Sequence, residues 1–382
     1  MSTKSLIFGD KVLLVIVLLL SLFSFFPVFS SSSYLSYVID GSSPIYYLVK
    51  HLIVILFGFV LMLSIKLVPF KFFRGMSIIL LPIGIGLLVY TLSQGTIIGG
   101  SVASRWIDIP FVGISFQTSA LAAIIIITYT ARYLSKVELS KTKFSETLIP
   151  LWLPIFTYIF LIFPANFSSA FLIFTALVIT LFISGFPLRH LFKVFLILGF
   201  LLITFFFTAK TFPDKFPNRI DTWLSRIENF GSNKNLDASY QIERAKMAIN
   251  NGGLIGVGAG KSIMKNHLPQ SNSDFIFAII VEEWGSIGGA FIICLYILMF
   301  FRFLSITHRI DDRFGKILVS GLGVFIIIQA FTNISVATQI IPVTGQNLPL
   351  ISSGGSSAWM TCISLGMILS VSSSIKNKNG KQ

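Results

Sequence analysis

The sequence predicts an all-α polytopic membrane protein with about ten transmembrane helices. Two observations carry this prediction: hydrophobic residues make up 54% of the chain and charged residues only 12%, and the charges leave long apolar runs between them. Soluble globular chains hold about 25% charged residues, so this composition excludes that class. A helix needs roughly 20 apolar residues to cross the hydrocarbon layer, and it satisfies its backbone hydrogen bonds internally.

The charge-free runs place the expected helices in chain order. Single spans are expected within 12–39, near 46–65, within 76–104, within 109–131, near 190–209 and near 275–301. Two longer runs each hold a pair of helices: 147–188 is interrupted by FPAN at 163–166, and 317–375 is interrupted by PVTGQNLPLISSGG at 342–355. Proline, glycine and asparagine favour turns at these interruptions. The whole chain, 1–382, is therefore expected to form a single transmembrane domain.

Lysine and arginine concentrate in alternate short loops, which indicates the cytoplasmic side. The alternation places both termini in the cytoplasm, makes 374–382 a short basic cytoplasmic tail, and puts the segment 210–273 on the outer side. The net charge of +14 fits anionic lipid headgroups, and no nucleic-acid binding is expected. Cys294 and Cys362 both lie in apolar runs, so they build neither a disulfide framework nor a metal cluster.

The outer segment 210–273 is the expected place for chemistry, because long loops in compact proteins are usually functional. Arg219, Trp223 and Arg226 recur at helical spacing within it. In one interpretation the two guanidiniums bind a diphosphate while the indole rests on a sugar or lipid. In the other, the same residues anchor an interfacial helix among the lipid headgroups.

The stretch GLIGVGAGKS at 253–262 ends like a nucleotide-binding phosphate loop. Ile255 stands where that motif requires glycine, so ATP binding is not expected. We expect the glycines instead to let the backbone turn tightly and approach a bulky ligand.

Asp274 stands where SNSD meets an apolar run, and two interpretations are open from the residues alone. A carboxylate there can cap the eighth helix, whose dipole favours an anion, or it can act as a general base at a partly dry boundary. Glu282 and Glu283 lie about 12 Å further along a continuous helix. Intramembrane carboxylates normally face a cavity or a partner. They predict either a polar pocket or ion path below Asp274, or a structural pairing with a cytoplasmic-side cation.

The motifs taken together resemble one family. LPQSNSDFIFAIIVEEWGSIGG and VTGQNLPLISSGGSS are similar to the FtsW/RodA/SpoVE proteins, the SEDS (shape, elongation, division and sporulation) family. The likeness extends over nearly the whole chain, through SRWID, FQTSALA, TWLSRI, SYQIERAKMAINNGGLIGVGAGKS, DDRFGK and QAFTNISVATQIIPVTG. Lys265 and IPVTGQNLPLIS favour a division-type member over an elongation-type one.

The resemblance implies ten transmembrane helices in the bacterial inner membrane, with a large extracytoplasmic loop between helices seven and eight. It implies a peptidoglycan glycosyltransferase that polymerises lipid II into β-1,4-linked glycan strands and releases undecaprenyl pyrophosphate, in cell division or elongation. Asp274 matches the family's essential aspartate and would take the proton of the attacking sugar hydroxyl. The implied partners are lipid II, a class B penicillin-binding protein transpeptidase, and other division or elongation proteins.

We expect substrate contacts from basic, aromatic and polar residues of the outer loops, namely Arg219, Trp223, Arg226, Tyr240, Gln241, Lys265, Thr344, Ser352 and Ser356. Arg219, Arg226 and Lys265 are the candidates for stabilising the leaving diphosphate. No nucleotide is needed, because the diphosphate linkage carries the driving energy. A divalent cation is an option for assisting the leaving group, although the sequence shows no acidic cluster to hold a metal.

This chain departs from the family pattern at several positions. Asn272 stands where histidine is usual, and Gln270 replaces an acid. Ala120 and Ala123 replace a glutamate and a lysine of the fourth helix, and Ser353 replaces a tyrosine. An ion pair of the family is therefore missing.

A lipid II flippase or proton-coupled carrier is the alternative function, since ten helices with buried carboxylates also describe a transporter. A transporter of this kind is expected to show internal repeats, and the sequence has no clear one. A non-enzymatic scaffold that recruits division partners is a third class, in which Asp274 has no chemical role.

Overall fold

The computed structural model describes residues 9–35, 43–94, 97–98, 101–102, 106–109, 114–138, 141–211, 236–268 and 270–379. Within these residues, eight spans are long and apolar enough to cross a membrane, α8 is a shorter apolar helix, and α9 is an apolar helix of 24 residues. These ten membrane-type helices confirm the predicted fold class of a multi-pass membrane protein.

The helices follow one another along the chain with these bounds: α2 (Lys11–Leu35), α3 (Pro44–Leu67), α4 (Lys71–Ser93), α5 (Thr118–Lys136), α6 (Phe144–Thr147), the π-helical turn η2 (Leu148–Trp152), α7 (Leu153–Ile162), α8 (Phe167–Ile183), α9 (Leu188–Thr211), α11 (Leu236–Gly252), the 3-10 turn η4 (Met264–Asn266), α12 (Ile276–Arg309), α13 (Arg313–Ala337) and α14 (Gly355–Asn379). α6, η2 and α7 together make one span. α11 and η4 belong to the outer segment predicted at 210–273.

Two small antiparallel hairpins separate α4 from α5. β1 (Ile97–Ile98) pairs with β2 (Ser101–Val102), and β3 (Trp106–Ile109) pairs with β4 (Ile114–Gln117). Isoleucine and aromatic side chains favour strands where the chain leaves the membrane and need not be helical. The helices expected within 76–104 and 109–131 therefore lie at 71–93 and 118–136 instead.

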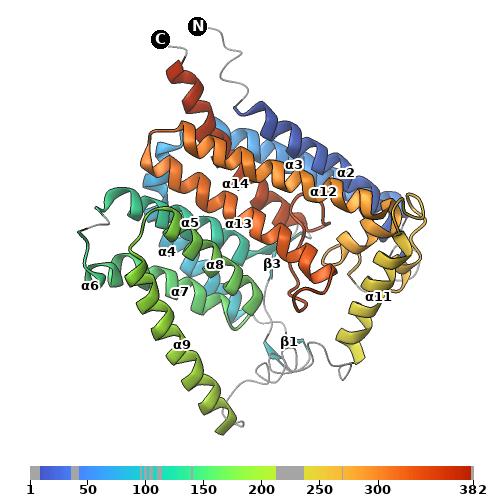
Figure 1. Ribbon diagram of the computed structural model, residues 1–382, viewed down its shortest axis with the longest axis horizontal. Helices are drawn as coiled ribbons and strands as arrows, with labels where there is room; N and C mark the ends of the chain where they lie inside the picture. Colours follow the sequence, from blue (N-terminus) through green and yellow to red (C-terminus); the bar gives the residue numbers. More distant parts are fainter. Residues whose placement is uncertain are drawn as a thin grey trace.

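The three helices α12, α13 and α14 run side by side through the bundle (Figure 1). α13 packs against α5 and α8, while α14 packs against α3, which also contacts α2. Within their most apolar windows, α13 and α14 are 72% buried and α3 and α4 only 22% buried. α13 and α14 thus form the centre, and α3 and α4 present apolar faces to lipid. The start of α2 and the end of α14 lie at the same end of the bundle, as an even number of spans requires (Figure 1).

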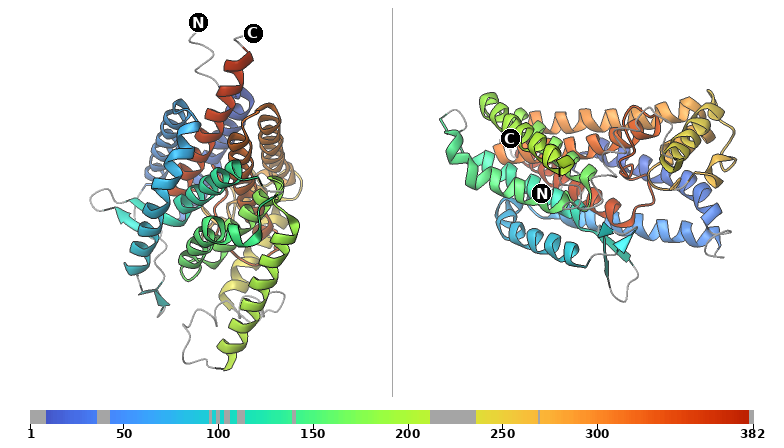
Figure 2. Two further views of the ribbon diagram at one scale, coloured as in Figure 1. Left: turned by 90° about the vertical axis from the view of Figure 1, so that its left-hand side faces the viewer. Right: turned by 90° about the horizontal axis from the view of Figure 1, so that it is seen from below.

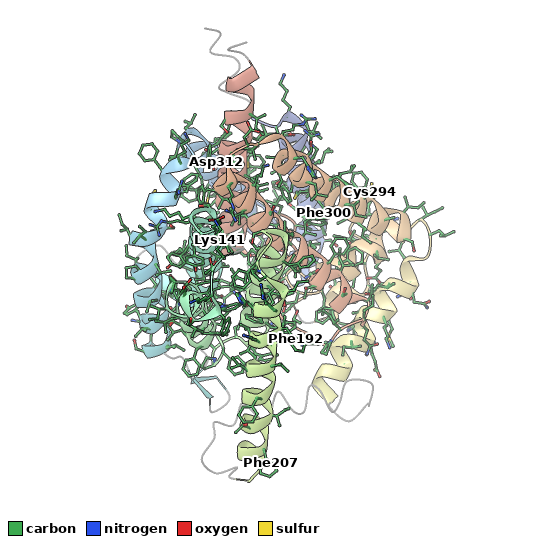
Figure 3. The ribbon with its side chains drawn as sticks, turned by 60° about the vertical axis from the view of Figure 1, so that its left-hand side comes forward. Lys141, Phe192, Phe207, Cys294, Phe300 and Asp312 are labelled. Carbon is green, nitrogen blue, oxygen red and sulfur yellow. The ribbon has the colours of Figure 1, made fainter. Side chains whose placement is uncertain are left out.

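α9 stands partly apart from the other helices. Its C-terminal half extends beyond α7 and α8 (Figure 2). Phe192 and Phe207, near its two ends, are both exposed (Figure 3). Apolar side chains on such a helix are suited to a lipid environment.

α12 is broken at Gly285, whose φ of 69° and ψ of −174° are not helical. A break inside a membrane exposes backbone groups that need other partners. The carbonyl of Glu282 accepts a hydrogen bond from Val257 N at 3.0 Å, and that of Glu283 accepts one from Gly258 N at 3.0 Å. The glycine-rich segment after α11 therefore donates hydrogen bonds to the carbonyls that have no helical partner at the break.

The same segment also accepts hydrogen bonds from the backbone amides that follow the break. Ser286 N donates to Gly253 O at 2.9 Å, and Ile287 N donates to Leu254 O at 3.3 Å. A Cβ at Gly256 would lie 2.2 Å from the carbonyl oxygen of Glu283, so the two backbones approach this closely only because Gly256 is glycine. The close approach predicted for these glycines thus occurs, but it is made to α12 rather than to a bulky ligand.

Candidate functional site

A cavity of about 800 Å³ lies between α3, the peptide that leads into α12, and the loop that joins α13 to α14. Among the described residues of its lining, Asp274 is the only acid and Lys50 the only cation. Its other polar groups are amides, hydroxyls and the indoles of Trp106 and Trp359. Ligand cavities in proteins usually have about 300–1,000 Å³, so this one is large enough for a sugar-sized substrate.

The peptide that leads into α12 is held from the α13–α14 loop. The carbonyl of Asn272 accepts from the amide of Ser353 at 3.0 Å and from its hydroxyl at 2.8 Å. The carbonyl of Ser273 accepts from the hydroxyl of Ser352 at 2.6 Å. The loop between α13 and α14 therefore fixes the two residues directly before Asp274.

Asn333 on α13 completes this support. Its side-chain amide donates to the carbonyl of Asp274 at 2.9 Å and to the carbonyl of Gln346 at 2.7 Å. Gln346 in turn donates from Nε2 to the hydroxyl of Ser169 on α8 at 2.9 Å. Three consecutive carbonyls, at 272, 273 and 274, are thus held by buried or half-buried partners, and the backbone at Asp274 is held in place.

Asp274 itself is buried and lies on the cavity wall. α12 begins at Ile276, with Phe275 in the N-cap position and no side-chain cap from that residue. The helix cap thus falls one residue beyond Asp274.

Glu282 is fully buried and binds the segment that leads into η4. Its carboxylate accepts hydrogen bonds from the hydroxyl of Ser262, from Ile263 N at 3.2 Å and from Met264 N at 3.3 Å. These groups come from the segment between α9 and α12. Their hydrogen bonds offset the free-energy cost of burying the Glu282 side chain.

Glu283 is also buried, and it joins the outer loop to α2. It accepts from the hydroxyl of Ser30 on α2 and from Ser262 N at 3.4 Å. Lys265 donates to the same Ser30 hydroxyl at 3.2 Å and to Gly260 O at 2.7 Å. Neither glutamate lines the cavity that contains Asp274. Both carboxylates thus lie in a cluster of hydrogen bonds with the segment between α9 and α12, which also supplies Lys265, while Oε2 of Glu283 is buried without a hydrogen-bond partner.

The described lining of the cavity does not include the other predicted substrate residues Tyr240, Gln241, Lys265, Thr344, Ser352 and Ser356, although Thr344, Ser352 and Ser356 directly neighbour lining residues in the chain. Ser356 accepts from Gln117 N at 3.1 Å, and the Thr344 hydroxyl is buried without a hydrogen-bond partner. Tyr240 is exposed on α11, next to half-buried Gln241, and its ring lies 4.8 Å from the guanidinium of Arg244. Arg219, Trp223 and Arg226 lie outside the described residues.

The cavity contains functional candidates that the sequence patterns did not single out, namely Lys50, Trp106, Gln329 and Trp359. Trp106 is brought to the wall by the β3–β4 register, which pairs it with Gln117. Lys50 had a recognisable signal, because a lysine inside an apolar helix normally faces a cavity or a partner. No group of three or more histidine, cysteine, aspartate or glutamate residues suited to a metal ion occurs in the part of the chain that the structure describes.

The sequence pattern of the FtsW/RodA/SpoVE family, described as cell cycle proteins, matches residues 10–377. The chain belongs to this family. A probable peptidoglycan glycosyltransferase FtsW of Hydrogenovibrio crunogenus is 31% identical over 333 residues, which cover 86% of this chain and 82% of that protein. The stage V sporulation protein E of Bacillus subtilis is 29% identical over 366 residues, which cover 95% and 96%.

Solved structures show the same fold for this FtsW/RodA/SpoVE member. A chain from a peptidoglycan synthase complex, described for its structural coordination of polymerization and crosslinking, superposes with a TM-score of 0.74 at 21% identity over 96% of this chain and 98% of its own. The crystal structure of the rod shape determining protein RodA from Thermus thermophilus has a TM-score of 0.67 at 21% identity, over 95% and 96%. At this level of identity the likeness concerns the fold alone.

Proposed function

We propose that this protein is a peptidoglycan glycosyltransferase that polymerises lipid II into β-1,4-linked glycan strands. The single observation that carries the proposal is the placement of Asp274 on the wall of a cavity of about 800 Å³, with its backbone fixed by Asn333. The names of the FtsW relatives, which are peptidoglycan glycosyltransferases, support it.

In the proposed reaction, the Asp274 carboxylate takes the proton from the 4-hydroxyl of one lipid-linked disaccharide. The oxygen then bonds to the anomeric carbon of N-acetylmuramic acid on a second lipid-linked chain. The bond from that carbon to the diphosphate breaks with inversion, and its electron pair leaves on undecaprenyl diphosphate. A positioned general base contributes about 10²–10⁴-fold to such a step. The cavity has a single carboxylate among its described lining, so no step is assigned to a metal.

The proposed location is the bacterial inner membrane, with both termini in the cytoplasm. The charge-poor outer loops and the basic loops on the other side support this orientation. We propose that 1–382 is one SEDS transmembrane domain, with 210–273 as its large extracytoplasmic loop and 374–382 as its basic tail. A class B penicillin-binding protein is the proposed partner, since a structural relative is part of a synthase complex. Other division or elongation proteins complete the proposed assembly.

The experiment uses purified protein with labelled lipid II, both in detergent and in sealed vesicles. We expect the native protein to make polymer and Asp274→Asn to make almost none, while neither moves lipid II across the vesicle bilayer. Translocation of lipid II without polymer would favour the flippase alternative. Polymer from neither the native protein nor its complex with a transpeptidase would reject the proposed function.

A further inference from the structure

Lys50, on α3, and Asp274, on the peptide that leads into α12, both line the cavity. α3 begins at Pro44, after Ser43 caps it by accepting from Ile45 N at 3.3 Å. At 1.5 Å per residue, Lys50 is roughly 9 Å along this helix from its first residue. Lys50 therefore lies in the second turn of α3, inside its candidate membrane span.

One face of α3 forms this wall. The residues Tyr46, Val49, Lys50, Ile53 and Val54 all line the cavity, and they follow the three- and four-residue spacing of neighbours on one helix face. The indole N–H of Trp359 on α14 donates to Val54 O at 3.0 Å, which fastens this stretch of α3 to the bundle. The backbone of α3 at Lys50 is therefore held by packing of this helix.

Lys50 is an exposed side chain on the cavity wall, so its ammonium group is accessible to an anionic ligand that enters the cavity. Of the described lining, it is the only cation, and the other polar groups except Asp274 are neutral. Lys265, a predicted diphosphate-binding residue, donates to Ser30 Oγ and Gly260 O and does not line this cavity.

We propose that Lys50 binds the diphosphate of the polyprenyl diphosphate-linked donor, and that the adjacent face of α3 carries the start of its polyprenyl chain. Tyr46 and Ile53 line the cavity and are also 57% and 60% exposed, so the cavity wall continues into the lipid-facing surface of α3. A diphosphate at Lys50 thus has its apolar chain next to lipid and its sugar next to Asp274.

This inference rests on the proposed function and adds the residue that receives the leaving charge. While the 4-hydroxyl oxygen bonds to the anomeric carbon and Asp274 takes its proton, the bond from that carbon to the diphosphate oxygen breaks. The departing oxygen gains the electron pair, and the Lys50 ammonium stabilises that added negative charge. An ammonium positioned at the developing charge lowers the barrier most when it is held in place beforehand.

The test measures binding without turnover, in full-length protein in detergent. Trp106 and Trp359 line the cavity, so tryptophan fluorescence reports its occupation. The probes are geranylgeranyl diphosphate, geranylgeraniol and inorganic pyrophosphate, added to native protein, Lys50→Gln, Lys50→Arg and Lys71→Gln. Lys71 is exposed at the start of α4, so its substitution removes the same charge from a site outside the cavity.

We expect Lys50→Gln to weaken geranylgeranyl diphosphate binding by about 10- to 100-fold, which is the loss of a charged hydrogen bond. Geranylgeraniol binding should not change, Lys71→Gln should match native protein, and Lys50→Arg should keep the affinity within about threefold because its cation remains. In native protein the prenyl diphosphate should bind more tightly than inorganic pyrophosphate. A thermal unfolding midpoint equal to that of native protein confirms that Lys50→Gln is folded.

Equal diphosphate affinity in native protein and Lys50→Gln would overturn the proposal, as would Lys50→Arg binding as weakly as Lys50→Gln. If inorganic pyrophosphate bound as tightly as the prenyl diphosphate, the claim that the bound diphosphate is lipid-linked would be wrong. Repeating the titration in Asp274→Asn separates the two proposals. Lys50-dependent binding that is retained in Asp274→Asn is the expected result. Lys50-dependent binding by native protein that makes no polymer would support this inference and reject the proposed function.

Discussion

Asn333, near the C-terminal end of α13, donates to the backbone carbonyl of Asp274 at 2.9 Å. Its side-chain amide also donates to Gln346 O at 2.7 Å, so one residue of α13 ties the peptide before α12 to the α13–α14 loop. Because Asn333 is buried, no water can replace these bonds without rearrangement. The backbone that carries the proposed base is thus held by a residue on another helix.

Asn333→Leu is expected to reduce polymerisation and to destabilise the protein. The substitution leaves two buried carbonyls without their donor, at a cost of about 1–3 kcal/mol each. We expect kcat with lipid II to fall about tenfold, the effect of a tilted base. Thr338→Ala, near the exposed end of the same helix, is the control and should leave both kcat and the unfolding midpoint near native values. Native kcat in Asn333→Leu would contradict this role.

Gly256→Ala is expected to prevent normal accumulation of the protein. Its Cβ would lie 2.2 Å from the carbonyl oxygen of Glu283, where backbone cannot yield, and its φ is 88°. Gly260→Ala is the matched control, because its φ of 75° is also left-handed but nothing lies within 4 Å of the added Cβ. We expect Gly260→Ala to cost only about 1–2 kcal/mol. Membrane yield and unfolding midpoint of the two variants measure the difference, and equal behaviour would be evidence against the close approach.

Glu282→Gln is expected to release the outer loop from α12. The amide group of glutamine has one acceptor oxygen where the carboxylate has two, so it cannot accept from Ser262, Ile263 and Met264 together. Hydrogen exchange of the Ile263 and Met264 amides should become faster by tenfold or more, on the order of a lost charged hydrogen bond. The amides of α13 serve as an internal reference. Unchanged exchange at 263 and 264 would show that the carboxylate does not hold this loop.

Asp10→Ala is expected to lower stability at the other end of the bundle. Asp10 caps α2 by accepting from Leu13 N at 3.0 Å and pairs with Arg302 on α12, whose side chain is 25% exposed while that of Asp10 is 8% exposed. We expect a loss of about 1–3 kcal/mol from the cap and the shielded pair. Glu138→Ala removes an exposed ion pair, in which the side chain of Lys141 is 77% exposed and that of Glu138 is 66% exposed. This substitution should lower the free energy of unfolding by less than about 1 kcal/mol. Denaturant unfolding of both variants decides the comparison.

The membrane helices were predictable because lipid leaves a spanning chain few alternatives to the helix. The runs bounded by Lys11 and Asp40, or by Lys316 and Lys376, therefore predicted spans directly. The hairpins before α5 were not predicted, since β1, β2 and β4 lie inside the charge-free runs 76–104 and 109–131, which are apolar enough to hold helices. The length of an apolar run does not indicate where the chain leaves the bilayer.

The break in α12 was hidden for a different reason. Gly285 sits in a run that is otherwise helical, and a single glycine in such a run is usually tolerated. Only the distant segment from Gly253 to Gly258, which bonds across the break, makes the non-helical φ of Gly285 stable. For the same reason Glu282 and Glu283 were expected around a pocket, although their partners lie in the outer loop. Long-range pairing of this kind has no local signal.

The candidate site was predictable at Asp274 and less so around it. Family motifs pointed to polar loop residues such as Ser352 and Ser356, whose hydroxyls bind backbone groups instead. Lys50 belongs to an apolar run, and the predicted basic substrate contacts all came from the loops, so Lys50 was not among them. A lysine within a spanning helix is the stronger indicator of a ligand.

The most direct measurement is the rate of glycan formation by Asp274→Asn under single-turnover conditions, with excess enzyme and radiolabelled lipid II. Asparagine has nearly the same shape but cannot take the proton, so the rate should fall by about 10²–10⁴-fold. Binding of geranylgeranyl diphosphate should meanwhile stay at the native level. A native rate of polymerisation in this variant would contradict the account, because the proton would then be taken by another group.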